Sequence, residues 1–124
     1  MTTITEPGIL IRINQKYRKG MSDEELFEAT RGVWKINENG LEAKKAKYAF
    51  AIYKGEIKEV YKIKEWHKAG TTSYKTRQDV HDPRRREFAG GLAEDEIRNK
   101  YLSKSVKEYF KKGSRNPTIY VNCE

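Results

Sequence analysis

The stretch KYAFAIYKGEIKEVYKIKEW, residues 47–66, constrains the fold of this 124-residue chain more than any other segment. It contains two runs rich in β-branched and aromatic residues, joined at Lys54 and Gly55, and this pattern predicts a β-hairpin. Large side chains and alanines alternate along the first run, so one face is bulky and the other permits close packing. The bulky face consists of Tyr48, Phe50 and Ile52.

Regular alternation is lost after this first run. Ile57 and Val60 break the period of two, which predicts a bulge or twist near Glu59 and a sheet that curves. From residue 67 to residue 86 no apolar period is visible, and this stretch is predicted to be a long polar loop. A short strand in REFAGG would leave that loop.

The remaining segments predict several short elements. ILIRIN, residues 9–14, alternates like a strand with a strongly buried face, and Ser22 with Glu25 forms a capping box at a helix start. Gly32 tolerates the positive φ that ends many helices, and VWKI after it is typical of a strand. The other expected elements are an Asn-Gly turn in 37–40, helices in 93–102 and 103–113, and a strand in 116–123.

This order of elements indicates an α+β fold. Strands dominate, and consecutive strands are expected to pair antiparallel. Such a chain closes most economically as a small curved, mostly antiparallel β-barrel with short helices at its ends. A chain of 124 residues fits one domain, so residues 1–124 are predicted to form a single unit.

The net charge of +8 is unevenly distributed. Residues 1–40 carry 6 basic and 6 acidic side chains, whereas residues 41–124 carry 20 basic and 12 acidic ones. A positive field of this kind favours a polyanionic partner, most commonly nucleic acid, with an anionic membrane surface as the competitor. Solubility alone would also account for it.

Cysteine usage and the first residues suggest a compartment. Cys123 is the only cysteine, so no intrachain disulfide forms and no thiol cluster is available for zinc. The start MTTITEPG lacks a cationic leader and an apolar run, and no segment reaches the length of a membrane span. We expect a soluble cytoplasmic protein without a metal or cofactor, and its oligomeric state is left open.

Basic residues form two groups in the later part of the chain. Arginines on a flexible segment can each contact a phosphate, and their planar guanidinium groups also stack on bases. A solvated, non-binding loop is the alternative for either group. The nucleic-acid candidates from these groups are Lys75, Arg77, Arg84, Arg85, Arg86 and Arg115.

Aromatic and glycine-flanking residues add further candidates. Trp34 and Trp66 offer π faces on which an unstacked base can lie, and Trp66 opens the basic loop. Trp34 alternates in step with Ile36, so a core position is its alternative role. Arg31 stands beside Gly32, where it either contacts a phosphate or base edge or is simply a surface arginine at a helix stop.

Catalytic patterns are weaker. The loop acids Asp79, Asp82 and Glu87, together with His81, are the residues from which a metal-dependent nuclease would be built. The alternative class is a protein-interaction subunit for an acidic partner, which accounts for the charge and less well for the aromatic residues.

The order of elements, with GVWKI after the first helix, the 47–66 hairpin and the closing NPTIYVN strand, resembles PUA-like domains, the superfamily of EVE, ASCH and YTH modules. The Gly-x-Lys-x-x-Glu-x-Arg signature of ASCH proteins is absent. The resemblance implies a curved β-barrel that binds RNA or DNA, with some members holding a modified base between aromatic walls. It places Trp34 and Trp66 at those walls, with Arg31 and residues 75–86 at a phosphate-binding rim.

Together these observations predict a non-catalytic nucleic-acid-binding module. It would grip the backbone of RNA or DNA with a basic rim and take an unstacked base into an aromatic pocket. The nuclease and the protein-interaction subunit remain the alternatives.

Overall fold

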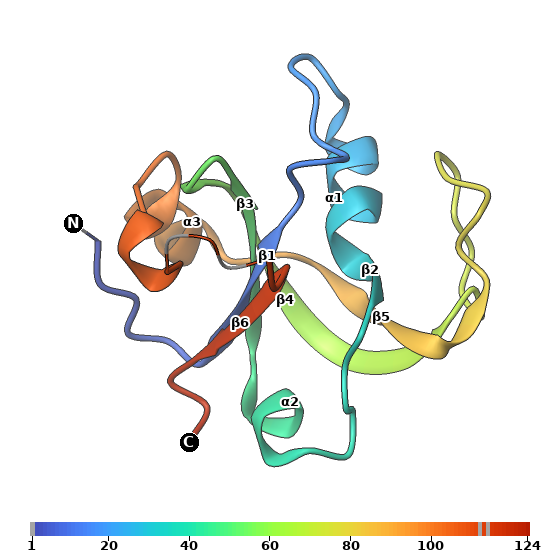
Figure 1. The fold of residues 1–124 in the computed structure, drawn as a ribbon. Helices are drawn as coiled ribbons and strands as arrows, with labels where there is room; N and C mark the ends of the chain where they lie inside the picture. Colours follow the sequence, from blue (N-terminus) through green and yellow to red (C-terminus); the bar gives the residue numbers. More distant parts are fainter. Residues whose placement is uncertain (1, 112, 114) are drawn as a thin grey trace.

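The computed structural model describes residues 2–111, 113 and 115–124, and shows a six-stranded sheet that curls into a half-barrel (Figure 1). The strand order is β2-β5-β4-β3-β1-β6. The strands are β1 (Gly8–Arg12), β2 (Gly32–Trp34), β3 (Tyr48–Tyr53), β4 (Glu56–Ala69), β5 (Asp82–Leu92) and β6 (Thr118–Val121). The helices are α1 (Asp23–Arg31), α2 (Leu41–Lys45), α3 (Asp95–Tyr101) and a 3-10 turn at Lys107–Tyr109.

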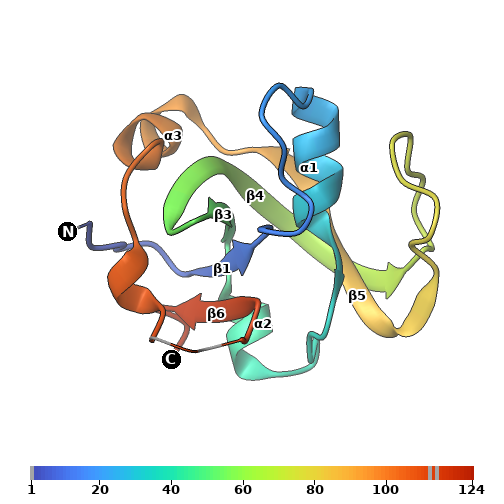
Figure 2. The same ribbon diagram turned by 45° about the horizontal axis from the view of Figure 1, so that its top comes forward.

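The predicted central hairpin is confirmed as β3 and β4. Lys54 and Gly55 have φ values of 49° and 78°, as a two-residue type I′ turn requires. The pairing shifts between Ala51 opposite Glu59 and Ile52 opposite Ile57, so β4 carries one extra residue. This bulge is the predicted irregularity near Glu59, and Figure 2 shows that the long strand β4 is strongly curved.

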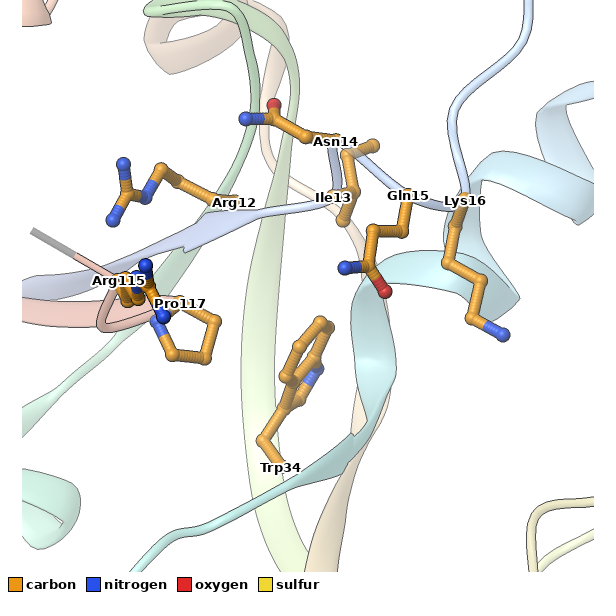
Figure 3. Close-up of a pocket in the computed structure, with 8 residues that line it drawn as sticks. All are labelled: Arg12, Ile13, Asn14, Gln15, Lys16, Trp34, Arg115 and Pro117. Atoms are coloured by element: carbon orange, nitrogen blue, oxygen red, sulfur yellow. The ribbon is translucent and has the colours of Figure 1, made fainter. Parts of the chain in front are cut away.

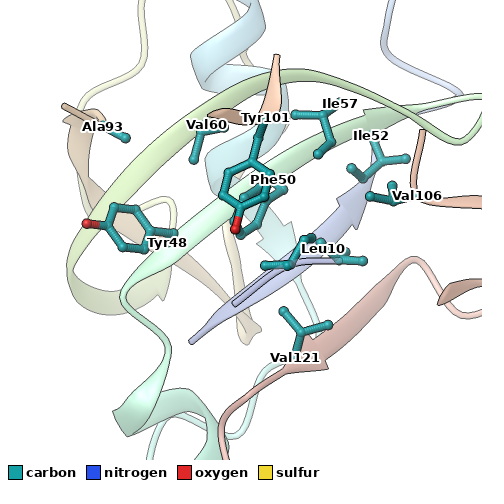
Figure 4. Packing of buried hydrophobic residues seen from close by; sticks show 11 residues of the cluster. Leu10, Tyr48, Phe50, Ile52, Ile57, Val60, Ala93, Tyr101, Val106 and Val121 are labelled. Atoms are coloured by element: carbon teal, nitrogen blue, oxygen red, sulfur yellow. The ribbon is translucent and has the colours of Figure 1, made fainter. Parts of the chain in front are cut away.

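Each face of the sheet has its own apolar cluster. Large side chains of β3 pack on one face with α3 and the segment after it (Figure 4). The alanines of β3 lie on the other face, where Phe27 of α1 and Tyr61 come within 5.0 Å between ring centroids. Because Ala49 and Ala51 are small, helix α1 can lie close to the sheet. The capping box of Ser22 and Glu25 at the start of α1 is also confirmed.

Contrary to the expectation from the sequence, strand β1 does not pair with the next strand of the chain, β2, and pairs instead with β3 and β6. Strands β1 and β3 run parallel, with Gly8 opposite Tyr48 and Arg12 opposite Ile52, while the other neighbouring strands are antiparallel. The chain between them contains α1, β2 and α2, so it is long enough for the crossover that parallel strands need. The buried faces of β1 predict a central strand but carry no information about direction.

The predicted loop 67–86 is wrong in extent. Strand β4 continues to Ala69 and β5 begins at Asp82, so the loop covers only residues 70–81. His67 pairs with Glu87 and Lys68 with Arg86 in an extension of the β4–β5 ribbon. This end of the ribbon, with the loop that joins its strands, lies at the right-hand side of Figure 1, away from β1, β3 and β6. Since its side chains have little core to face, they do not show the apolar alternation by which a strand is recognised.

The predicted helix in 103–113 is also wrong, and its Lys112 lies outside the described residues. The segment forms only the 3-10 turn, because its backbone bonds to the hairpin instead. Ser103 N donates to Ile57 O at 2.9 Å and Val106 N donates to Gly55 O at 2.7 Å. These non-local bonds replace the i to i−4 bonds of a helix. Within the described chain, no helix is long and apolar enough to cross a membrane.

Candidate nucleic-acid interface

A cavity of about 490 Å³ lies where the ends of β1, β2 and β6 meet, and Figure 3 shows its walls. This volume is within the range of pockets that hold a small molecule or a base. The chain turns sharply after β1, because Lys16 N and Tyr17 N both donate to Ile13 O. The lining residues are Arg12, Ile13, Asn14, Gln15, Lys16, Trp34, Arg115 and Pro117.

Trp34 forms the aromatic wall of this cavity. It is the last residue of β2, and its Nε1 donates to Thr30 O at 2.7 Å, which fixes the orientation of the indole. The side chain is half-buried, since it also packs against the apolar cluster on the α1 face of the sheet. Pro117 lies opposite the indole in Figure 3, and the Gln15 side chain extends toward the ring. Trp34 is therefore both a packing residue and a cavity residue.

The charge of the cavity is positive. Arg12, Lys16 and Arg115 line it, and none of its described lining residues carries a carboxylate. Arg12 Nη2 donates to Asn116 O at 2.8 Å, and its guanidinium carbon lies 4.6 Å from the centroid of the Phe110 ring. Lys16 and Arg115 are exposed. Cations, an indole and side-chain amides thus meet at one hollow of the surface.

Arg31 is turned into the protein. Its side chain is 6% exposed, donates to Thr72 Oγ1 and to Ser73 O at 2.7 Å each, and lies 3.7 Å from Glu87. The guanidinium also lies 3.9 Å from the centroid of the Tyr74 ring. Thr72, Ser73 and Tyr74 belong to the 70–81 loop, and Glu87 accepts hydrogen bonds from that loop. Arg31 therefore holds the loop against α1.

Arg77 and Gly32 also lie where the 70–81 loop meets the end of α1. Arg77 Nη1 donates to the carbonyls of Glu28 at 2.8 Å and Gly32 at 2.5 Å. Gly32 is in extended conformation with φ of −158°, so it does not end α1 through positive φ as predicted. A side chain at Gly32 would collide with Tyr74 Oη. The glycine is therefore explained by the close approach of the loop.

Two buried carboxylates, those of Glu28 and Glu87, hold the 70–81 loop in place. Glu28 is not among the candidate functional residues predicted from the sequence. Glu87 accepts from Gly70 N at 2.7 Å, from Thr72 N at 2.9 Å, from Tyr74 Oη at 2.9 Å, and from Thr72 Oγ1. Glu28 accepts from Lys75 N at 2.8 Å and from both the backbone and hydroxyl of Thr76. No local signal marks this role in the sequence, because on a helical wheel Glu28 lies away from Leu26, Phe27 and Ala29.

These carboxylates should make the protein sensitive to acid. Burial acts to raise the pKa of Glu87 and Glu28, but hydrogen bonds from Thr72 and Thr76 and their neighbours outweigh it, and both pKa values lie below the usual one. A carboxylate with a depressed folded-state pKa contributes stability above its unfolded pKa of about 4.3. This contribution is lost as the pH falls through the folded-state value.

We therefore expect the free energy of unfolding to fall below about pH 4, measured by urea unfolding between pH 7 and pH 3. Glu28→Gln should show a shallower acid dependence than the wild-type protein, because one of the two titrating anchors is gone. An unchanged acid slope in this variant would contradict the assignment.

The other predicted basic residues lie on the ribbon or on the 70–81 loop and do not line the Trp34 cavity. Arg84 and Arg85 contact Asp82 at 3.3 and 3.6 Å, and Arg86 contacts Glu38 at 2.8 Å. Arg86 is nevertheless the strand partner of Trp34. Lys75 is exposed on the loop, 3.8 Å from Glu24. Of the predicted cations, only Arg115 lies at the cavity, whereas Arg12 and Lys16 were not selected.

Trp66 lines a different cavity, of about 330 Å³, beside α2. Its ring meets Phe88 edge-on at 5.6 Å, and its Nε1 is buried without a hydrogen-bond partner in the described structure. The two indoles therefore do not wall one pocket.

Two acids of the nuclease hypothesis, Asp82 and Glu87, have other roles. Asp82 is bonded to Arg84, and Glu87 is the loop anchor. Among the described residues, no group of three or more His, Cys, Asp or Glu side chains is arranged to hold a metal ion. Comparison with known proteins gave no matching family model, curated protein or solved structure.

Proposed function

We propose that this protein binds nucleic acid non-catalytically, with an unstacked base against Trp34 and the adjacent backbone phosphates on Lys16 and Arg115. The observation that carries the proposal is the convergence of an indole and three cations on one cavity whose described lining has no carboxylate. The net charge of +8 supplies a favourable long-range field for the same partner.

The chemistry of each wall suits a nucleotide. An aromatic face contributes about 1–3 kcal/mol per stacked base, and every base offers such a face. Asn14 and Gln15 present amides, which can both donate to and accept from a base edge. A base inside a duplex stack cannot reach the cavity, so the ligand is a single strand or a flipped nucleotide, in RNA or DNA. A PUA-like architecture fits the half-barrel and this mode of binding.

The test compares charge reversal at two exposed lysines. Lys16→Glu should weaken binding of a single-stranded oligonucleotide about tenfold and lower the salt slope of log K by about 0.7 per lost phosphate contact. Lys75→Glu changes the net charge equally but lies on the loop, so its effect should be much smaller. Fluorescence anisotropy at two salt concentrations measures both, with RNA and DNA strands.

Two results would count against the proposal. No binding of any strand at low salt would remove nucleic acid as the ligand. Equal losses in the two variants would mean that the oligonucleotide responds to net charge and does not use the Trp34 cavity.

A further inference from the structure

Two tyrosines form a stacked pair beside the turn that lines the Trp34 cavity. Tyr17 ends this turn, and Tyr53 is the last residue of β3. Their ring centroids are 4.4 Å apart with planes inclined by 32°, and both side chains are half-buried. A pair of this kind presents a partly exposed aromatic surface, which the proposed base contact at Trp34 does not use.

Lysines surround this pair. Lys58 Nζ lies 5.5 Å from the Tyr17 ring centroid and 6.0 Å from that of Tyr53, and Lys54 Nζ lies 5.4 Å from that of Tyr53. Glu56 contacts Lys58 at 2.9 Å, and this hydrogen bond raises the pKa of Lys58. Lys58 therefore stays charged at neutral pH, and both lysine side chains lie next to aromatic faces, which is the combination that single-stranded nucleic-acid sites use.

The tyrosine pair and the cavity are structurally continuous. Lys54 N donates to the cavity residue Asn14 at 3.1 Å, and Ile13 N donates to Ile52 O at 2.9 Å. By strand alternation Tyr53 lies on the same face of β3 as Ala49 and Ala51, the face that Tyr17 and Trp34 also pack against. A single-stranded nucleic acid that leaves the cavity on this side therefore passes the two tyrosines next.

We infer that the pair Tyr17 and Tyr53, with Lys54 and Lys58, is a second stacking subsite for the same single strand, and this inference rests on the proposed function. The ligand class is then a single-stranded oligonucleotide, with one base at Trp34 and a flanking base on the tyrosines. A mononucleotide occupies only the first position. A continuous duplex offers neither base, because its bases are stacked on each other.

The experiment measures binding of a single-stranded octanucleotide and of a mononucleotide to three proteins. Tyr53→Leu keeps an apolar side chain without a π face and should weaken octanucleotide binding about tenfold, since a base loses its stacking partner. Tyr53→Phe keeps the ring and should bind like the wild-type protein. Mononucleotide binding, followed by NMR shifts of the indole N–H groups, should be the same in all three.

A second variant reports on charge without altering the rings. Lys54→Asn removes a cation at a position of positive φ that asparagine accepts, in the turn type that favours Asn-Gly. It should reduce the salt slope for the octanucleotide by about 0.7 and leave mononucleotide binding unchanged.

The outcomes separate the two proposals. If Tyr53→Leu and Lys54→Asn bind the octanucleotide like the wild-type protein while Lys16→Glu loses affinity, the second subsite is refuted and the proposed function stands. If Tyr53→Leu weakens the mononucleotide equally, the tyrosines shape the cavity and form no subsite. If the wild-type protein binds no strand, both proposals are overturned.

Discussion

Replacing Glu87 with alanine should lower the free energy of unfolding by about 3–5 kcal/mol, the usual cost of removing one partner of a buried ion pair. Glu87 is fully buried, and its carboxylate accepts hydrogen bonds from Gly70, Thr72 and Tyr74. Its removal leaves those donors without an acceptor and Arg31 without its buried counterion. Because small domains are stable by about 5–15 kcal/mol, this is a large share of the total.

Urea unfolding followed by circular dichroism measures the change, and two variants serve as controls. Glu108→Ala removes an exposed glutamate and should have a negligible effect. Glu87→Gln keeps the shape of the side chain, and the hydroxyls of Thr72 and Tyr74 can rotate to accept from its amide, so its loss should be intermediate. If Glu87→Ala were as stable as Glu108→Ala, Glu87 would not anchor the loop.

The sequence predicted those parts of the fold that depend on neighbouring residues. The turn at Lys54 and Gly55, the bulge near Glu59 and the capping box of α1 each follow from residues within a few positions of one another. The parallel pairing of β1 with β3 depends on where a distant segment docks, and no local pattern encodes it. The length of β5 was underestimated for a similar reason, because its first half pairs with β4 outside the core.

In the candidate site, too, local features were predictable from the sequence and contacts between distant residues were not. An arginine in a polar stretch can lie in solvent or against a buried acceptor, and the sequence around it does not distinguish these environments. Arg31 is directed inward because Glu87, 56 positions along the chain, lies near it in space, and Arg77 because the backbone carbonyls of Glu28 and Gly32 accept its hydrogen bonds. By contrast, the polar run Asn14, Gln15, Lys16 directly after an apolar strand is a local signal that a strand ends at the surface.

Deleting the indole of Trp34 should have the largest effect on binding. Trp34→Ala is expected to weaken binding of a single-stranded oligonucleotide by about 1–3 kcal/mol, or roughly 5- to 150-fold, because the base loses its stacking face. Trp34→Phe keeps an aromatic face but cannot donate to Thr30 O, so it should recover most of the affinity. Anisotropy titrations measure all variants, with each concentration corrected for the folded fraction.

Trp66→Ala is the matched control, since it deletes the same side chain from the cavity beside α2. Both tryptophans pack against the same apolar cluster, so both deletions should reduce stability. Only loss of Trp34 removes an aromatic wall that Lys16 and Arg115 share. If Trp66→Ala lost affinity while Trp34→Ala bound within twofold of the wild-type protein, the base would lie at Trp66, and the cations around Trp34 would have no nucleotide to hold.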